Sequence, residues 1–199
     1  DVYTGPVHGK ISGVVTTTDG IPLAGVSVSA QDVSSTTSEE GVYVLEDIDP
    51  NDNIVVTFTK QGYAKNYTTT YLQSWETVSS NVSLLEADGF EVIDANVSSN
   101  INIGDTKVRF SENSFLNSDG TPYAGEVTVQ ITHVDPSTSE IWGAPADMTA
   151  IAYSPQGSQT QAKNTTALSQ LVSYGMVDVT LFGSAGEELN ISSKSPAFL

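Results

Sequence analysis

The chain has 199 residues, enough for one large β domain or for two domains of about 100 residues each. Its 24 acidic and seven basic residues give a net charge of −17, which excludes nucleic acid as a partner, and no apolar run approaches the roughly 18 residues of a membrane-inserting helix. The lack of cysteine excludes disulfides, thiolate metal sites and cysteine nucleophiles.

Hydrophobic and polar residues alternate in six segments, as they do in a strand with one buried face. In chain order these segments are residues 10–15, 26–30, 42–45, 54–59, 127–131 and 176–182. Gly, Asp, Asn or Pro separates the segments, and no window holds a sustained helical period. The sequence therefore predicts an all-β protein made of antiparallel β-sandwiches.

One turn motif, Asp-Gly-x-Pro-x-Ala-Gly, occurs at residues 19–25 and again at residues 119–125. The Gly after Asp supplies the positive φ of a tight turn, Pro cannot donate to a strand ladder, and the second Gly permits a bulge. We interpret each copy as the marker of one sandwich module. The predicted domains are residues 1–87 and 88–199, and we expect the second to continue beyond the end of this chain.

Four segments of the first half follow one another in a recognisable order. They are a strand at 9–15, the turn and strand at 19–30, an acidic-Gly-Val-Tyr step into a strand at 40–45, and a strand at 55–63 that ends in Gly-Tyr. In this order they resemble the carboxypeptidase regulatory-like domain, over about residues 7–86. The resemblance implies a transthyretin-like (prealbumin-like) Greek-key sandwich of seven strands. It also implies a spacer or docking role, with no catalytic residues to carry over.

The second half is similar to the β-sandwich region that follows such domains in cartilage intermediate layer protein and in bacterial surface proteins. The similarity is carried by residues 108–110, 119–132, 146–150 and 173–179. At residues 112–114 the chain reads Glu-Asn-Ser where that pattern has Pro-Ala-Gly. The similarity implies a second sandwich and assigns it no chemistry.

The sequence contains no catalytic motif. His8 and His133 are the only histidines, and neither lies in a metal-binding or triad spacing. The chain has no Gly-x-Ser-x-Gly elbow and no glycine-rich phosphate loop. We therefore predict no catalytic residues and no bound organic cofactor, and we expect that the chain is not an enzyme.

The acidic loop at residues 46–53 is the best candidate for a cation site. Asp47, Asp49, Asn51 and Asn53 place oxygen-bearing side chains at alternate positions, and a hard cation such as Ca²⁺ prefers oxygen ligands. Asp52 stands where the turn of an EF-hand requires Gly. The loop therefore predicts either a Ca²⁺ site or an ordinary polar turn between two strands.

Three tyrosines, Tyr63, Tyr67 and Tyr71, recur at four-residue steps. In a strand this even spacing places them on one face. An exposed tyrosine face would be a platform for stacking sugar rings, whereas a buried one would fill the sandwich core. Both interpretations fit the spacing.

The leading functional prediction is a non-catalytic structural or interaction module of a larger secreted or cell-surface protein, such as a lipoprotein or adhesin. It would act as a spacer or docking surface, with a protein or glycan at the cell surface as its partner. The alternative is a carbohydrate- or Ca²⁺-binding accessory module attached to an exported enzyme or adhesin. An enzyme in its own right is a distant third.

Overall fold

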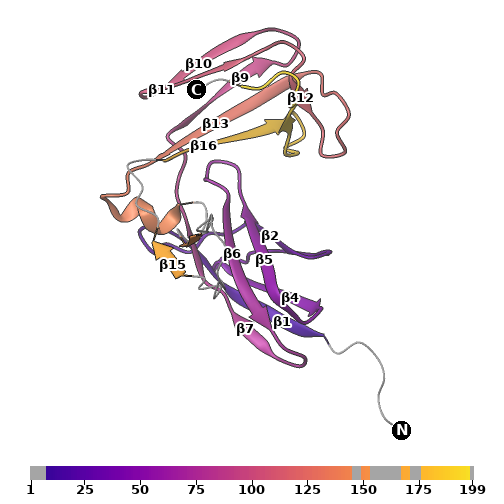
Figure 1. The fold of residues 1–199 in the computed structure, drawn as a ribbon, viewed down its shortest axis with the longest axis vertical. Helices are drawn as coiled ribbons and strands as arrows, with labels where there is room; N and C mark the ends of the chain where they lie inside the picture. The colour runs from indigo at the N-terminus through magenta and orange to yellow at the C-terminus, as the bar shows by residue number, and fades with distance from the viewer. Residues whose placement is uncertain (1–7, 145–148, 153–166, 171–175, 198–199) are drawn as a thin grey trace, which may run out of the picture.

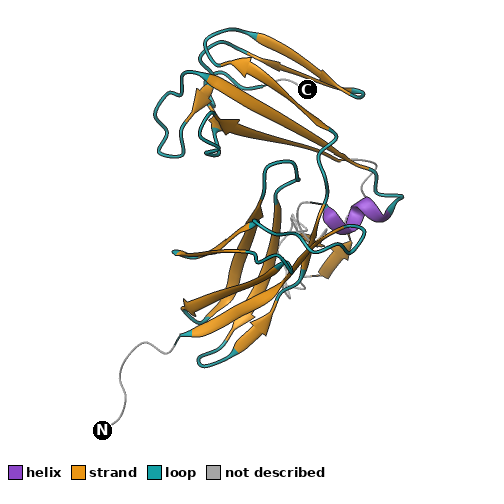
Figure 2. Ribbon diagram, turned by 180° about the vertical axis from the view of Figure 1, so that it is seen from behind, coloured by secondary structure: helices purple, strands orange, loops and turns teal. Residues whose placement is uncertain are grey.

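The computed structural model describes residues 8–144, 149–152, 167–170 and 176–197 (Figure 1). Within these ranges the regular elements are strands, apart from one short 3₁₀ helix, η1 (Ser139–Gly143). The prediction of an all-β sandwich protein is confirmed. No helix in the described ranges has the length and apolarity to span a membrane. Figure 2 shows two groups of strands, one above the other, that meet near η1.

Strands β1 to β8 form the first module. One of its sheets has the order β3-β2-β5-β6, and the other has the order β4-β1-β7, with β8 also paired to β1. The strands are β1 (Gly9–Thr17), β2 (Ser27–Ala30), β3 (Val33–Thr36), β4 (Val42–Ile48), β5 (Asn51–Thr59), β6 (Asn66–Leu72), β7 (Thr77–Ser79) and β8 (Val82–Leu84). Both sheets contribute to one core, in which the Tyr43 and Phe58 rings meet edge to face at 5.6 Å.

The strands β7 and β8 follow each other along the same edge of β1, and both pair with it in parallel. Between them, Ser80 N donates to Ser12 O, and Val14 N donates to Asn81 Oδ1 at 2.9 Å. The Asn81 side chain thus supplies an acceptor where the strand is interrupted. Taken as one interrupted strand, β7 and β8 complete the seven strands that the family resemblance implies.

The second module contains a sheet of order β16-β13-β9, a hairpin β10-β11 and a short pair β12-β17. Its strands are β9 (Gly89–Asp94), β10 (Ser99–Ile103), β11 (Thr106–Phe110), β12 (Phe115–Leu116), β13 (Glu126–Val134), β16 (Met176–Gly183) and β17 (Asn190–Ile191). Alternate residues of β13 (Val127, Val129 and Ile131) are fully buried in a core that is separate from that of the first module. The division at residue 87 stays a prediction, although the two cores lie on either side of it.

The Asp-Gly-x-Pro turn folds in the same way in both copies. In the first copy, Gly20 N donates to Thr17 O, Thr17 N donates to Ile21 O, and Leu23 N donates to Val15 O of the preceding strand. In the second copy, the residues 100 positions later make the same three bonds. These N to O distances are 3.0, 2.7 and 2.9 Å in the first copy and 2.9, 2.8 and 2.9 Å in the second. Gly20 and Gly120 have φ values of 81° and 83°.

A third turn has this hydrogen-bond pattern but lacks both Asp-Gly and Pro. It lies at residues 181–189, after β16. Gly183 N donates to Glu187 O, Gly186 N to Gly183 O and Leu189 N to Leu181 O. Gly186 has a φ of 82°. The second module therefore contains this turn twice.

After β13 the chain returns to the first module through η1. Gly143 packs so closely that a Cβ there would lie 2.8 Å from Leu85 N and 2.9 Å from Thr18 Cγ2. A short hairpin follows, made of β14 (Thr149–Ala152) and β15 (Ala167–Gln170), and Figure 1 shows β15 beside the first module. Residues 146–148 and 173–175, which support the resemblance of the second half, lie outside the described residues.

Candidate functional site

The predicted cation loop lies where β4 passes into β5. Asp47, with a φ of 58°, is in the last part of β4. The Asp49 backbone exchanges two hydrogen bonds of 2.9 Å with the Gln31 side chain, and Asn51 Oδ1 accepts from Asn53 N at 3.0 Å. In the part of the chain that is described, no group of three or more His, Cys, Asp or Glu side chains converges. Ca²⁺ binding by this loop stays a prediction.

The structure brings together only two of the three predicted tyrosines. Tyr67 and Tyr71 lie on the outer face of β6, with 38% and 47% of their surface exposed. Tyr63 precedes the strand and packs, half-buried, against the core of the first module. Tyr71 Oη accepts from Gln73 Nε2 at 2.6 Å. Glycan binding by the three tyrosines stays a prediction, and Tyr63 does not share their face.

The contact between the modules, which we call the junction, is centred on Gln130 of β13. Its Oε1 accepts from Gly62 N at 2.7 Å, and its Nε2 donates to Tyr63 O at 2.7 Å. The side chain therefore joins the second module to two backbone groups of the first, and the residue is 1% exposed. A buried amide with both ends bonded is costly to separate, because each freed group loses its partner without gaining water.

The segment that joins the modules is hydrogen-bonded along its length. Ala64 N donates to Leu85 O and Ala87 N donates to Gly62 O, so the segment first pairs with the first module. Asp88 N then donates to Ile131 O, and Asp88 Oδ2 accepts from His133 N at 2.7 Å, both on β13. The joining segment is therefore a paired strand extension that passes directly from one module to the next.

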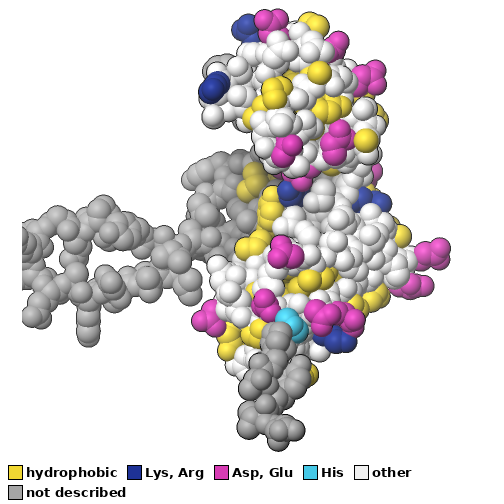
Figure 3. All heavy atoms as spheres, turned by 90° about the vertical axis from the view of Figure 1, so that its right-hand side faces the viewer, with side chains coloured by type: hydrophobic (Ala, Val, Ile, Leu, Met, Phe, Trp, Pro, Cys, Tyr) yellow, Lys and Arg dark blue, Asp and Glu magenta, His cyan; other side chains and the backbone are white. Residues whose placement is uncertain are grey.

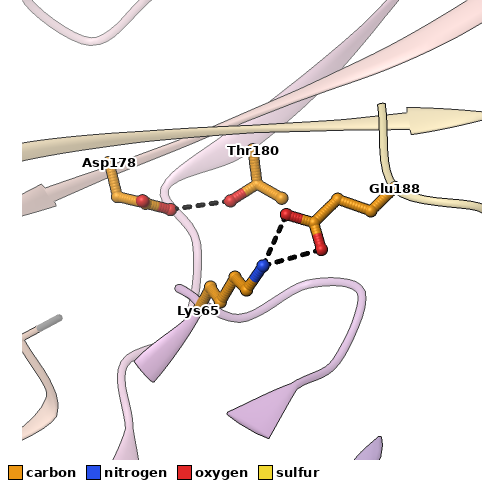
Figure 4. A network of polar contacts seen from close by, with 4 residues as sticks. All are labelled: Lys65, Asp178, Thr180 and Glu188. Carbon is orange, nitrogen blue, oxygen red and sulfur yellow. Dashed lines mark hydrogen bonds and ion pairs between the residues drawn. The ribbon is translucent and has the colours of Figure 1, made fainter. Parts of the chain in front are cut away.

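An apolar cluster and an ion pair complete the junction. Ala64 and Leu85 of the first module pack with Val134, at the end of β13, and Ala144, which follows η1. Lys65 Nζ binds both carboxylate oxygens of Glu188, at 2.7 and 2.8 Å, across the junction (Figure 4). Glu188 belongs to the third turn, so that turn faces the first module.

Two ionisable groups beside the junction are shifted by their surroundings. Burial opposes the charge on Lys65, but hydrogen bonds and Coulombic attraction from Glu188 outweigh it and hold the Lys65 pKa above 10.5. Burial raises the pKa of Asp178 above 3.8, against a hydrogen bond of 2.8 Å that Thr180 Oγ1 donates to its carboxylate. Figure 4 shows Asp178 and Thr180 beside the ion pair. The junction thus combines one matched pair with one carboxylate that is costly to ionise.

A groove of about 410 Å³ lies where η1 returns to the first module, and we call it the Trp142 groove. Its lining comes from β1, β6, the β7–β8 break, β8, η1 and the residue that follows η1. Trp142 and Tyr67 supply aromatic rings, and Asn66, Asn81 and Thr68 supply polar groups. The remaining lining residues are Val14, Thr16, Val82, Ser83 and Ala144. None of these described lining residues is charged, whereas acidic side chains are spread over the face of both modules seen in Figure 3.

Sequence reasoning did not identify Gln130 or Trp142. Gln130 occupies a polar position of the alternating strand β13, where an exposed side chain is expected, and its partners lie at Gly62 and Tyr63 in the other module. Trp142 lies in a 3₁₀ helix that has no strand pattern. Both residues gain their places from tertiary contacts between segments distant in sequence.

Residues 10–85 match the family model of the carboxypeptidase regulatory-like domain, so this part of the chain is such a domain. A comparison with curated proteins gives no match. The resemblance of the second half to the region that follows such domains stays a prediction.

Solved structures show distant similarity. A cohesin–X-dockerin complex from Acetivibrio cellulolyticus has 18% identity and a TM-score of 0.35, over 40% of this chain and 59% of that chain. The Bacillus anthracis TIE protein has 14% identity and a TM-score of 0.37, over 64% of this chain and 27% of that chain. A Bacteroides uniformis protein proposed to bind carbohydrate has 10% identity and a TM-score of 0.35, over 98% of this chain and 99% of that chain. These similarities are too distant to assign a function.

Proposed function

We propose that this chain is a non-catalytic structural and interaction module of a larger exported protein, and that its junction holds two sandwiches in one fixed relative position. The observation that carries the proposal is the bridge from Gln130 to Gly62 and Tyr63. A spacer or docking module needs a defined distance and angle between its ends, and a short paired linker with a buried polar bridge provides them.

Three further features support a fixed arrangement. The segment at residues 85–88 pairs with both modules, so it has few free backbone dihedrals. The apolar cluster at Ala64 and Leu85 excludes water from the same contact. The ion pair of Lys65 with Glu188 adds a charge-assisted contact at the edge, of modest value because it is partly exposed.

The family match and the composition support the rest of the proposal. Residues 10–85 match the carboxypeptidase regulatory-like family. The resemblance to that family implies a spacer or docking role beside other domains. The net charge of −17 favours a well-solvated surface, as in an exported protein. We propose a secreted or cell-surface location, with a protein or glycan as partner.

The proposal is tested by measuring distances between the modules. Because the chain has no cysteine, spin labels can be placed at Glu40→Cys and Asp105→Cys, which are exposed positions in the first and second modules. Double electron–electron resonance should give one narrow distribution of the distance between the two spin labels. A broad distribution, as two sandwiches on a flexible tether would give, would refute the fixed junction.

Replacement of the bridging amide sharpens the test. Gln130→Met keeps the length of the side chain but leaves Gly62 N and Tyr63 O without their partner, so we expect the distribution to broaden and the stability to fall by about 2 kcal/mol. Gln61→Met is the matched control, because Gln61 lies beside the junction but is exposed. A Gln130→Met protein with unchanged distances would show that the bridge does not set the arrangement.

A further inference from the structure

We propose that the Trp142 groove is a binding site for a neutral saccharide. The inference goes beyond the structural role, and it differs from the predicted tyrosine platform because it uses Tyr67 without Tyr63 or Tyr71. Apart from Trp142 and Ala144, its described lining residues belong to the first module; Trp142 lies on η1 and Ala144 directly follows it, packed onto that module. The site therefore does not depend on how the second module is oriented.

The aromatic walls suit a sugar ring. Trp142 is 77% exposed although it lies at a groove, and Tyr67 on β6 is 38% exposed, with Lys65 Nζ 5.5 Å from the centroid of its ring. Sugar rings present C–H groups on their faces, and these stack on the electron-rich faces of exposed aromatic rings. When a sugar ring covers an exposed tryptophan in a groove that a second aromatic residue also lines, apolar surface leaves water and the free energy falls.

The polar groups of the groove complement hydroxyl groups. Asn81 Oδ1 accepts from Val14 N, and among the described residues Asn81 Nδ2 donates no hydrogen bond. Thr16 Oγ1 and Ser83 Oγ share one hydrogen bond of 3.2 Å, which leaves each hydroxyl with further capacity. An amide donor and two hydroxyls around an apolar wall match the mixed surface of a saccharide.

The electrostatics select a neutral ligand. The described lining residues carry no charge, in a chain whose net charge is −17. A cationic ligand would have no carboxylate to meet in the groove, and an anionic ligand would be repelled by the surrounding surface. The volume of about 410 Å³ falls within the range of small-molecule sites.

The groove is held in shape before any ligand arrives. Gly143 and Ala144 are buried against the first module, and the Thr138 side chain caps η1 by accepting from Glu140 N. On the other wall, Asn66 is buried and donates from Nδ2 to Ser83 O at 3.1 Å. Both walls are therefore anchored by packing or hydrogen bonds, which lowers the entropic cost of binding.

The test is a titration of the whole chain with neutral trisaccharides of α- and β-linked glucose, galactose, mannose and xylose, followed by saturation-transfer NMR. We expect at least one trisaccharide to bind in the millimolar range or tighter, and Trp142→Ala to weaken that binding by about 30-fold. Trp75→Ala is the matched control, because Trp75 is 73% exposed but lies outside the groove, at the turn before β7. The control should bind as the unmodified chain does.

A second variant separates a binding role from a structural one. Asn81→Asp keeps an oxygen for Val14 N but removes the Nδ2 donor and adds a charge, so binding should weaken while the melting temperature changes little. The proposal is overturned if no trisaccharide binds at about 10 mM, if Trp142→Ala binds as well as the unmodified chain, or if Trp75→Ala loses binding to the same degree. Binding of charged saccharides alone would also overturn it.

Discussion

The first and second Asp-Gly-x-Pro turns follow the same backbone path but are held by different neighbours. The first turn lies under another turn, in which Gly41 O accepts from Val15 N and a Cβ on Gly41 would lie 2.4 Å from Val15 O. The second turn is tied through a side chain, because Tyr123 Oη donates to Glu126 O and accepts from Ser184 N of the third turn. One local geometry is thus built into two unrelated surroundings.

This difference separates what a turn motif determines from what it does not. The hydrogen bonds inside the turn recur at 17–23, 117–123 and 183–189, and the third copy forms without Asp-Gly or Pro. The element shared by all three is a Gly with φ near 80°, at residues 20, 120 and 186. The attachments of each turn, by contrast, come from residues outside the motif, such as Gly41 and Tyr123. Turn similarity is therefore weak evidence that two modules belong to one family.

The largest expected loss of stability is at Gly41, in the turn that packs over the first Asp-Gly-x-Pro turn. Gly41→Ala forces a side chain into a position with φ of 73° and against Val15 O, so we expect a loss of about 3 kcal/mol or more in the free energy of unfolding. Chemical denaturation measures it. Gly20→Ala is the control, since nothing lies within 4 Å of a Cβ at Gly20. If both variants lost the same stability, close packing over the first turn would not explain how its surroundings differ from those of the second turn.

The strands that alternation predicted lie in β1, β2, β4, β5, β13 and β16. In β13 the polar positions Gln130 and Thr132 are also buried, which alternation does not predict. Strands without that pattern were not predicted by it. In β10, Ile101 alone is fully buried, and Ser99, Asn100 and Asn102 are typical of a loop. The break between β7 and β8 also could not be predicted, since it depends on the Asn81 side chain replacing a backbone acceptor for a distant strand.

The candidate sites were harder to predict than the fold. Period-two spacing placed Tyr67 and Tyr71 on one face correctly, but it cannot tell where a strand begins, and β6 begins at Asn66, after Tyr63. Gln130 sits on the opposite face of β13 from Val129 and Ile131, and the sequence does not reveal that the first module covers this face. Sites made by contacts between modules need the relative placement of the modules, which local patterns do not contain.

A smaller loss of stability is expected when the glycine that the three turns share is replaced in one turn at a time. Gly20→Ala, Gly120→Ala and Gly186→Ala each force positive φ on a residue with a side chain, while a Cβ at each position meets nothing within 4 Å. We expect losses of about 1 kcal/mol that agree among the three turns. Asn variants should lose less, because Asn tolerates this region of φ. Clearly unequal losses in thermal unfolding would show that the surroundings, and not the turn itself, determine the strain.

The smallest expected effect distinguishes the two Asp residues. Asp119 Oδ1 accepts from Thr121 Oγ1 at 2.7 Å and from Thr121 N at 2.9 Å, and these bonds, the side-chain bond first, hold the pKa of Asp119 below 3.8. In the first copy the corresponding residue is Ile21, which has no hydroxyl, and in the described chain no hydrogen bond to the Asp19 carboxylate occurs. Asp119→Ala should therefore lower the melting temperature slightly at pH 7, whereas Asp19→Ala should leave it nearly unchanged.

The pH dependence of that difference follows from the sign of the shift. A carboxylate with a lowered pKa in the folded state stabilises the fold above its unfolded-state pKa, and this contribution is lost as the pH falls through the folded-state pKa. The difference between the unmodified chain and Asp119→Ala should therefore be full at pH 7 and shrink below about pH 3.8. Ile21→Thr supplies the missing hydroxyl to the first turn and should raise stability at pH 7, which calorimetry can measure. If Ile21→Thr gave no gain while Asp119→Ala lost stability, the side-chain bonds would depend on the surroundings of the second turn, and the two copies would differ in more than this one residue.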